Sequence, residues 1–570
     1  MKLFSLILAA LLLWICIACN TGGTQHDTGK RAAPDNNSPR IVQDVQLEEL
    51  LPPPPPLPPG RQHLEVAKIG TLNRKIGVVN DESPSDQVPP ATEENAYNTE
   101  DYYNIVENNF LAATQQPLST FSIDADEAAY SNIRRYLTGG SLPPAGAVRI
   151  EEMINYFDYS YPQPAGTDPF SVNTELAACP WSPKHQLVHI GLQGKEIPLT
   201  NLPSSNMVFL VDVSGSMDEP NKLPLVKASL KMLVDQLRAR DRIAIVVYAG
   251  SAGLVLPSTN GSNRIKIKEA IDNLKAGGAT AGGEGIRLAY NMARQYFIPG
   301  GNNRIVLATD GDFNVGVSSD DELVRMIEQE RESGIFLSVL GFGMGNYKDS
   351  KMQQLADKGN GNHSYIDNIS EAKKILVHEF GSTLFTIAKD VKIQVEFNPA
   401  LVKAYRLIGY ENRLLANEDF NDDLKDAGEL GSGHTVTALY EIIPAGVEDV
   451  FTIKADTLKY QRNEIKQNSA GSREIMTIKL RYKRPEDNTS MLLVHTVTDN
   501  DAEWVNTSDN FRFSCAVAEF GMLLRNSAFK QQSSLVQVTS LAQSAKGKDE
   551  NGYRSEFIQL VDAAHPMLRN

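Results

Sequence analysis

The sequence predicts an α/β fold, in which a doubly wound, mostly parallel, Rossmann-like sheet is inserted next to a β-rich, sandwich-like domain with C-terminal helices. Three observations predict it. In the middle of the chain, apolar runs alternate with amphipathic stretches at helical spacing, as repeated βαβ units do. Polar motifs follow these runs, where the carboxyl ends of parallel strands meet. Strand-like alternation also occurs on both sides of this central segment.

Length and composition limit the classes of function. The chain has 570 residues, which at roughly 150 residues per domain suggests three or four domains. Hydrophobic residues make up 41% and charged residues 22%, so a wholly disordered, collagenous or coiled-coil protein is excluded. The net charge of −15 argues against nucleic acid as the main partner, because phosphate binding needs a basic surface.

Residues 1–19 have the pattern of a lipoprotein signal peptide. The apolar run Leu3–Ile17 is shorter than the roughly 20 residues of a membrane span. It ends in Cys16-Ile17-Ala18-Cys19-Asn20, which resembles the bacterial lipobox and implies that Cys19 is lipidated. An ordinary cleaved secretory signal is the alternative. Because Asn20 is not an aspartate, the resemblance implies the outer membrane, and the lack of an acidic run after Cys19 favours its periplasmic face.

Residues 20–95 are predicted to be a disordered, proline-rich linker. The run Pro52–Pro56 favours an extended helix with a rise near 3.1 Å per residue. Apolar residues recur there without any period, so no core is expected. The linker therefore serves either as a stalk or as a binding site for a proline-recognising partner.

Four apolar runs in the central segment are predicted strands, because continuous apolar runs are typical of strands buried on both faces of a parallel sheet. The strands are Met207–Val213, Arg242–Tyr248, Arg304–Thr309 and Ile335–Leu340. Apolar residues at helical spacing predict helices between them. These are Val226–Leu237, Arg264–Leu274, Gly283–Phe297 and Asp321–Ser333.

Oxygen-bearing side chains follow the predicted strands. Asp212, Ser214 and Ser216 come directly after the first strand, a glycine-rich loop carries Thr280, and Asp310 follows a later strand. All five offer oxygen, as two carboxylates and three hydroxyls. Such hard ligands suit Mg²⁺ first, with Mn²⁺ or Ca²⁺ as alternatives. Mg²⁺ usually keeps several waters, so one position can be left for a ligand from a partner.

These motifs, in this order and spacing, resemble the von Willebrand factor type A (VWA) domain. The resemblance implies that Asp212, Ser214, Ser216, Thr280 and Asp310 form its metal-ion-dependent adhesion site (MIDAS). It also implies that a carboxylate of a protein partner, from Asp or Glu, completes the coordination of the metal. The alternative is an intact fold whose site serves only an internal contact.

The flanking segments resemble a family of bacterial lipoproteins that carry such a VWA domain. The resemblance lies in Pro117–Asp124 and Arg149–Phe157 before the VWA domain, and in Phe385–Val391 and Ala404–Arg413 after it. It implies an N-terminal flanking domain at 96–200, the VWA domain at 201–380 and a C-terminal β-rich and helical domain at 381–565. The role of the flanks does not follow from the resemblance.

Strand and helix patterns in the flanks predict one sandwich built from both sides of the VWA domain. Predicted strands are Phe170–Ala177, Gln186–Leu192, Val391–Phe397, Thr435–Ile443, Val450–Ala455, Ile475–Tyr482 and Met491–Val497. Predicted helices are Ala128–Leu137, Arg149–Phe157, Phe513–Arg525, Ser533–Ala545 and Tyr553–Ala564.

Two acidic groups and one histidine have competing interpretations. Asp124 and Asp126 are either metal ligands or, as favoured here, an N-terminal helix cap. The acidic segment 414–433 lacks the order of a calcium-binding loop, so a solvated loop is favoured. Its aspartates are Asp419, Asp422, Asp423 and Asp426. His363 is interpreted as a polar residue at the edge of the sheet rather than as a catalyst.

The two cysteines of the mature chain also allow two interpretations. Cys179 and Cys515 either form a disulfide, which an exported compartment permits, or remain two separate buried thiols.

Enzyme motifs are lacking in the sequence. There is no phosphate loop, no Gly-x-Ser-x-Gly elbow and no second histidine after His378-Glu379. The sequence therefore lacks the motifs that would indicate an ATPase, an esterase or a zinc protease. The prediction is a non-enzymatic, lipid-anchored envelope protein that uses a divalent metal to bind a carboxylate of a protein partner. An assembly scaffold whose metal site makes intramolecular or self-association contacts is the alternative, and a metal-dependent hydrolase is the weaker one. The oligomeric state is not predicted.

Overall fold

The computed structural model describes residues 100–124, 126–198, 200–278, 282–311, 313, 320–379, 385–452, 471–485, 487, 489–499 and 503–568. The chain divides into two compact units, 1–91 and 92–570, and all described residues belong to the second. The predicted signal peptide, Cys19 and the linker lie outside the described residues. Among the helices of the described part, none combines the length and the apolar character needed to cross a membrane.

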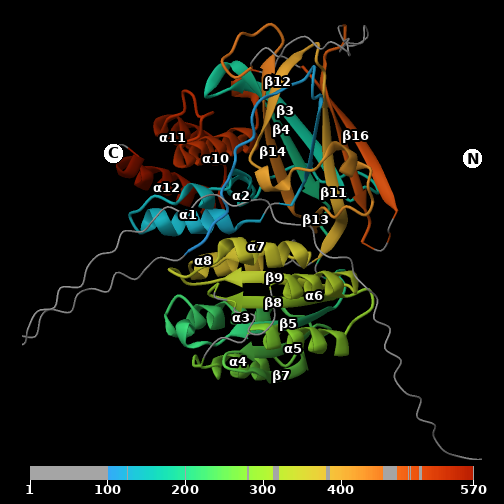
Figure 1. The fold of residues 1–570 in the computed structure, drawn as a ribbon, viewed down its shortest axis with the longest axis vertical. Helices are drawn as coiled ribbons and strands as arrows, with labels where there is room; N and C mark the ends of the chain where they lie inside the picture. Colours follow the sequence, from blue (N-terminus) through green and yellow to red (C-terminus); the bar gives the residue numbers. More distant parts are fainter. Residues whose placement is uncertain are drawn as a thin grey trace, which may run out of the picture. The chain divides into compact units, whose positions relative to one another are not determined.

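The described central segment folds into a six-stranded sheet with the order β10-β9-β8-β5-β6-β7 (Figure 1). Its strands are β5 (Ser205–Asp212), β6 (Arg242–Tyr248), β7 (Ala252–Asn260), β8 (Asn302–Thr309), β9 (Ile335–Gly341) and β10 (His363–Tyr365). Neighbouring strands are parallel except β7, which runs antiparallel to β6. The predicted doubly wound, mostly parallel sheet is confirmed.

Alternate residues of the central strand β5 enter two different cores, as the period of two in a strand requires. Phe209 packs with α3 and α4 on one face, and Leu210 packs with α5, α6 and α7 on the other. These helices are α3 (Leu223–Gln236), α4 (Arg264–Asp272), α5 (Gly282–Gln295), α6 (Asp320–Glu332) and α7 (Asp349–Lys358), and the short α8 (Ile369–Lys373) follows β10. Burial on both faces explains the continuous apolar sequence of β5.

The described strands of the two flanks form one sandwich of two antiparallel sheets. The first has the order β1-β12-β14-β4-β3, and the second has the order β13-β11-β15-β16 with β2 paired to β11. Strands from before and after the central sheet pair directly, with Leu439 opposite His189 and Ile393 opposite Phe121. The central sheet is therefore inserted between the two halves of the sandwich, as predicted.

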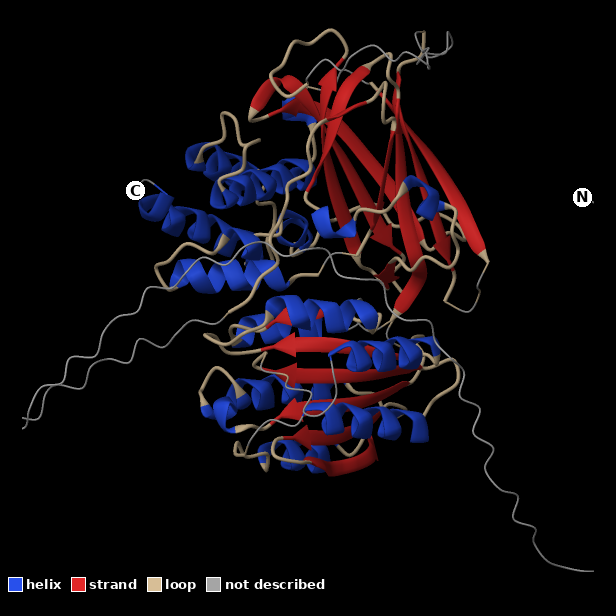
Figure 2. Cartoon of the chain, viewed as in Figure 1, coloured by secondary structure: helices blue, strands red, loops and turns tan. Residues whose placement is uncertain are grey.

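The strands of the sandwich are shown in red in Figure 2. Those before the insertion are β1 (Leu111–Ala112), β2 (Leu118–Ser122), β3 (Phe170–Cys179) and β4 (Ser182–Gly194). Those after it are β11 (Thr386–Phe397), β12 (Val402–Ile408), β13 (Gly428–Gly431), β14 (Thr435–Pro444), β15 (Glu474–Lys483) and β16 (Ser490–Thr498).

A helical layer covers the outer face of the first sheet. Its members are α1 (Ala128–Thr138), α2 (Ile150–Asn155), α10 (Asp509–Arg525), α11 (Leu535–Ser544) and α12 (Tyr553–Leu568). Tyr130, Phe157 and Phe513 share one buried cluster with Leu187 and Leu439 of the sheet. The strands β4 and β14 are consequently buried on both faces, which explains the nearly continuous burial of β14.

The predicted strand at Val450–Ala455 is wrong in its described part. Residues 450–452 form no strand, and 453–455 lie outside the described residues. The side chain of Asp449 accepts the backbone N–H groups of Phe451 and Thr452 at 2.7 and 2.8 Å. Such local bonds favour a turn over a strand ladder, and they leave Val450 88% exposed.

Candidate metal centre

The Asp-x-Ser-x-Ser motif lies at the carboxyl end of β5. Asp212 is the last residue of the strand, and its Oδ1 accepts the N–H of Ser214 at 2.8 Å, which closes a turn of the kind that aspartate favours. The turn brings the Oγ atoms of Ser214 and Ser216 to 3.1 Å from each other. Asp212 and Ser214 are buried, whereas Ser216 is exposed. The motif therefore forms a compact group of oxygens that opens to solvent on the side of Ser216.

The glycine-rich loop lies directly beside this turn. Gly215 donates its N–H to the carbonyl of Gly278 at 3.0 Å, and Gly277 donates to the carbonyl of Val213 at 2.8 Å. Gly278 has a φ of +93°, a conformation that only glycine adopts without strain. Thr280 belongs to the same glycine-rich sequence but lies outside the described residues.

Asp310 follows β8, the parallel neighbour of β5, so both aspartates lie at one edge of the sheet. Thr309 Oγ1 donates to Asp212 Oδ2 at 3.4 Å. Burial, together with the charge of Asp310, raises the pKa of Asp212 to about 6, although the hydrogen bonds from Ser214 act to lower it. Two buried carboxylates at one edge disfavour each other's charge, which a divalent cation would relieve.

Two further residues contact Asp310 that the sequence motifs did not indicate. Lys222 Nζ donates to Asp310 Oδ2 at 3.1 Å, and Asn346 Nδ2 donates to the same oxygen at 3.3 Å. Lys222 is the N-cap residue of α3, and Asn346 belongs to the loop between β9 and α7. No motif marks either of them, since each reaches the site only through the packing of its loop.

These side chains fit a divalent metal of the hard class. Over the described part of the chain, no group of three or more His, Cys, Asp and Glu side chains is placed to hold a metal ion. The predicted site has only two carboxylates, Asp212 and Asp310, and would therefore need the hydroxyls of Ser214 and Ser216 together with water. A donor set of carboxylate, hydroxyl and water is typical of Mg²⁺ sites.

A cavity adjoins the metal edge. It has a volume of about 650 Å³ and is lined by α1, α12 and the loops that carry Asn221 and Met344. Met344 is 54% exposed. Loops of the central sheet and the flanking helices α1 and α12 thus line the same cavity beside the predicted site.

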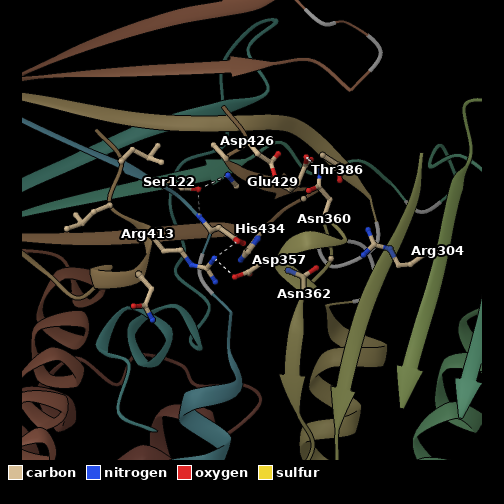
Figure 3. Close-up of a pocket in the computed structure, with 18 residues that line it drawn as sticks. Ser122, Arg304, Asp357, Asn360, Asn362, Thr386, Arg413, Asp426, Glu429 and His434 are labelled. Atoms are coloured by element: carbon tan, nitrogen blue, oxygen red, sulfur yellow. Dashed lines mark hydrogen bonds and ion pairs between the residues drawn. The ribbon is translucent and has the colours of Figure 1, made fainter. Parts of the chain in front are cut away.

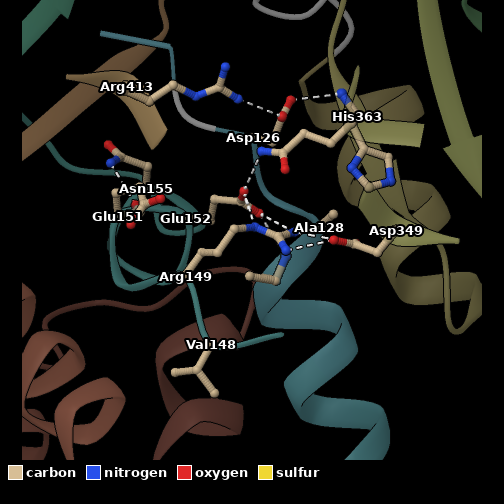
Figure 4. A network of polar contacts seen from close by, with 12 residues as sticks. Asp126, Ala128, Val148, Arg149, Glu151, Glu152, Asn155, Asp349, His363 and Arg413 are labelled. Atoms are coloured by element: carbon tan, nitrogen blue, oxygen red, sulfur yellow. Dashed lines mark hydrogen bonds and ion pairs between the residues drawn. The ribbon is translucent and has the colours of Figure 1, made fainter. Parts of the chain in front are cut away.

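Asp124 and Asp126 do not cap helix α1, so that prediction is wrong. Both are paired with Arg413, at 3.1 and 3.2 Å. Figure 4 shows Asp126 between Arg413 and the backbone N–H of His363, which it accepts at 2.8 Å. The N-terminus of α1 is instead satisfied by Glu152, whose Oε2 accepts the N–H of Ala129 at 2.9 Å. A carboxylate from another helix replaces the local cap.

His363 lies in β10, an edge strand of the central sheet, as interpreted, but its side chain is buried. Its Nε2 lies 2.5 Å from the hydroxyl of Tyr347, and burial lowers its pKa to about 3. It is therefore a neutral core histidine at neutral pH.

Arg149 is the centre of the network in Figure 4. Its guanidinium bonds Glu152 of α2 and lies 2.6 Å from Asp349 of α7. This buried triad fastens the flanking helices to the central sheet, which is a structural role.

A second cavity, of about 190 Å³, lies at the other end of the sheet (Figure 3). Arg304, near the start of β8, and Asn362, just before β10, line it together with residues of the sandwich. It is lined by the amino ends of strands whose carboxyl ends face the predicted metal site. Asp426 of the acidic segment borders it and pairs with Arg331 at 2.5 Å.

The other aspartates of the acidic segment are exposed or half-buried, and cationic side chains of the sandwich contact this segment at two of them. Asp423 pairs with Arg481 at 2.9 Å, and the backbone carbonyl of Asp419 accepts from Lys392 at 3.1 Å. The loop thus fits the favoured solvated interpretation and is additionally tied to the sandwich.

The two cysteines are free. Cys179 and Cys515 are both buried and belong to the same apolar cluster beneath the helical layer. Of the two alternatives, the structure has separate buried thiols, and the disulfide is not formed. Burial raises the pKa of both thiols.

Comparison with family models covers most of the described chain. Residues 206–377 match the von Willebrand factor type A domain, a class that commonly binds a metal at a MIDAS, and residues 96–189 match a model described as von Willebrand factor. Residues 382–567 match "Uncharacterized protein YfbK, C-terminal".

Among curated relatives, the chain is similar to the uncharacterized protein YfbK of Escherichia coli. The two are 44% identical over 471 residues, which cover 81% of this chain and 80% of the relative.

Two solved structures are also similar. The von Willebrand factor type A protein from Catenulispora acidiphila is 16% identical, with a TM-score of 0.38, over 67% of this chain and 88% of its own. Proximal thread matrix protein 1 from the mussel byssus, with a zinc-occupied MIDAS motif, is 24% identical, with a TM-score of 0.26, over 31% of this chain and 44% of its own. On the extent of the match to its Escherichia coli relative, the chain belongs to the YfbK family of VWA-domain proteins.

Proposed function

We propose that the protein is a non-enzymatic binding protein, which uses a divalent metal at the carboxyl edge of its central sheet to bind an acidic side chain of a protein partner. One observation supports this most. Buried Asp212, Ser214 and Asp310 lie beneath an exposed Ser216, so a cation held there would be protected by protein on one side and accessible to a partner on the other.

Each side chain has a defined part in this proposal. Asp212 and Asp310 would supply negative charge, directly or through water, while Ser214, Ser216 and Thr280 would orient the coordination. The metal, with Mg²⁺ as the first candidate and Mn²⁺ or Ca²⁺ as alternatives, would supply a position for a carboxylate oxygen of the partner. The exchange of a water for a charged oxygen favours anionic partners over neutral ones.

We further propose that the protein is anchored in the cell envelope through lipid on Cys19, at the outer membrane and facing the periplasm. Support comes from the sequence pattern of residues 1–20 alone. Incorporation of labelled palmitate into the wild type, and its loss in Cys19→Ala, would test this part separately.

The metal proposal is tested by titrating the full chain with Mg²⁺ in a calorimeter, beside Asp212→Ala. We expect saturable binding in the wild type and none in the variant. Asp218→Ala is the matched control, because Asp218 lies in the same loop but is exposed. Equal binding in the wild type and Asp212→Ala would refute the assignment of the site.

A scaffold function is the second candidate, and one contact favours it. Glu100 accepts the N–H of Gly345 at 2.8 Å, so the flank is fastened to the loop that brings Asn346 to Asp310. Under this alternative, Asp212→Ala changes the oligomer size in the presence of Mg²⁺. Under the first proposal it abolishes binding of an acidic partner and leaves the oligomer size unchanged, while loss of the bound metal lowers the melting temperature in Mg²⁺ under both.

A further inference from the structure

We propose that Lys222 is a built-in counter-cation of the metal site, which makes tight retention of the metal dependent on an acidic ligand from outside. This inference rests on the proposed metal-dependent function and goes beyond the motif residues. It assigns to Lys222 a positioning and specificity role, because it would act through the charge of the site without holding the metal itself.

The geometry places a fixed ammonium group beside Asp310. Lys222 Nζ is 3.1 Å from Asp310 Oδ2, and the two side chains are 4% and 0% exposed. The other acidic neighbour, Glu219, lies 3.4 Å from Nζ but is 57% exposed, so water screens its charge. The ammonium therefore acts mainly on the buried carboxylate of the site.

The position of Lys222 is enforced by packing. Gly343, with a φ of +76°, lies against its aliphatic stem, and a Cβ at residue 343 would come within 2.5 Å of Lys222 Cε. The stem is covered by this loop, and the N–H of the lysine is bonded to the carbonyl of Glu219 at 3.0 Å. The charge consequently has little freedom to swing away when a cation enters.

The charge balance of the site determines whether the metal-loaded site favours an added carboxylate. Asp212, Asp310 and Lys222 together leave one negative charge, so a bound divalent cation would leave the site with one positive charge. A carboxylate from outside neutralises this excess. Without the ammonium, the two carboxylates alone would neutralise the cation, and an added carboxylate would create an excess of negative charge. Lys222 thus lowers the affinity of the site for the metal alone. It raises the affinity of the metal-loaded site for a carboxylate ligand.

The test is Mg²⁺ calorimetry on the full chain in sodium acetate and in sodium chloride of equal ionic strength. For the wild type, we expect acetate to tighten Mg²⁺ binding by about tenfold, a coupling of the size usual between sites. Lys222→Met keeps the stem and removes the charge. It should bind Mg²⁺ in chloride about tenfold more tightly than the wild type, and its Mg²⁺ affinity should not be higher in acetate than in chloride.

Two further variants guard against simple structural effects. Lys222→Gln keeps a hydrogen-bond donor toward Asp310 and should behave like Lys222→Met. Lys231→Met removes the same charge from the same helix at a surface pair with Asp272, 2.7 Å away, and should behave like the wild type. The melting temperature in EDTA shows whether each variant is folded.

The outcomes separate this inference from the function on which it rests. If the wild type and the two Lys222 variants bind Mg²⁺ equally, with equal effects of acetate, the role of Lys222 is refuted and the metal site stands. If neither the wild type nor any Lys222 variant binds Mg²⁺ in either salt, the proposed function is refuted together with it.

Discussion

Replacing Arg149 by methionine should destabilise the protein, because it removes the buried ion pairs that connect the flanking helix α2 to the central sheet. The guanidinium bonds Glu152 and lies 2.6 Å from Asp349, and the three side chains are 1%, 2% and 0% exposed. Methionine would leave two buried carboxylates without their cation. Removing one partner of a buried ion pair costs about 3–5 kcal/mol, so we expect the free energy of unfolding to fall by that amount.

The assay is equilibrium urea unfolding at pH 7.5, followed by tryptophan fluorescence. Lys231→Met, which breaks a surface pair, is the control and should cost at most about 1 kcal/mol. A triple variant, Arg149→Met with Glu152→Gln and Asp349→Asn, should recover most of the loss, because none of the three charges of the triad remains and the amide introduced in place of Glu152 still offers an oxygen to the N–H of Ala129. A loss below about 1 kcal/mol for Arg149→Met alone would refute the reasoning.

Three further outcomes follow from the site and the core. Asp310→Asn should abolish Mg²⁺ binding in calorimetry while the chain stays folded, and retained binding would remove Asp310 from the site. Burial raises the pKa of Glu519 to about 8 from 4.5, so its stabilising contribution is complete below pH 4.5 and is lost as the pH rises toward 8. Between pH 5 and 8.5, the free energy of unfolding of the wild type should therefore fall by on the order of 4 kcal/mol through Glu519. Glu519→Gln should remove this part of the fall, as measured by urea unfolding at the two pH values. Cys179 and Cys515 should react with a thiol reagent only in denaturant, and fast labelling of either of these two residues in the native chain, located by peptide mass spectrometry, would contradict their burial.

The elements of the central sheet were predictable where burial alone determines the sequence. The strand β6 has the predicted bounds, and β5 and β9 differ from the predicted ones by at most two residues at either end, because strands buried on both faces are continuously apolar. The strand β7 was missed. It lies at the edge, contains Pro257 and exposes Leu254 and Val255, so it lacks both the apolar run and the alternation.

Only part of the candidate site could be predicted. Asp212, Ser214, Ser216 and Asp310 follow strands at motif spacing, and the structure brings the motif residues that it describes to one edge. Lys222 and Asn346 carry no such signal, because a single lysine or asparagine in a loop is ordinary surface composition. Their contacts with Asp310 depend on how the loops before α3 and α7 pack, which is tertiary information.

The loop between β9 and α7 links the site to the flank. Asn346 donates to Asp310, while the adjacent Gly345 donates its N–H to Glu100, which also pairs with Arg135 of α1 at 2.8 Å. Since a hydrogen bond to a charged group contributes about 1.5–3 kcal/mol, a shift of this loop on metal binding would have to break or strain that contact. The energy of the flank contact and that of the proposed metal site would then be coupled, and a variant of Glu100 should change the Mg²⁺ affinity measured by calorimetry although Glu100 is no ligand.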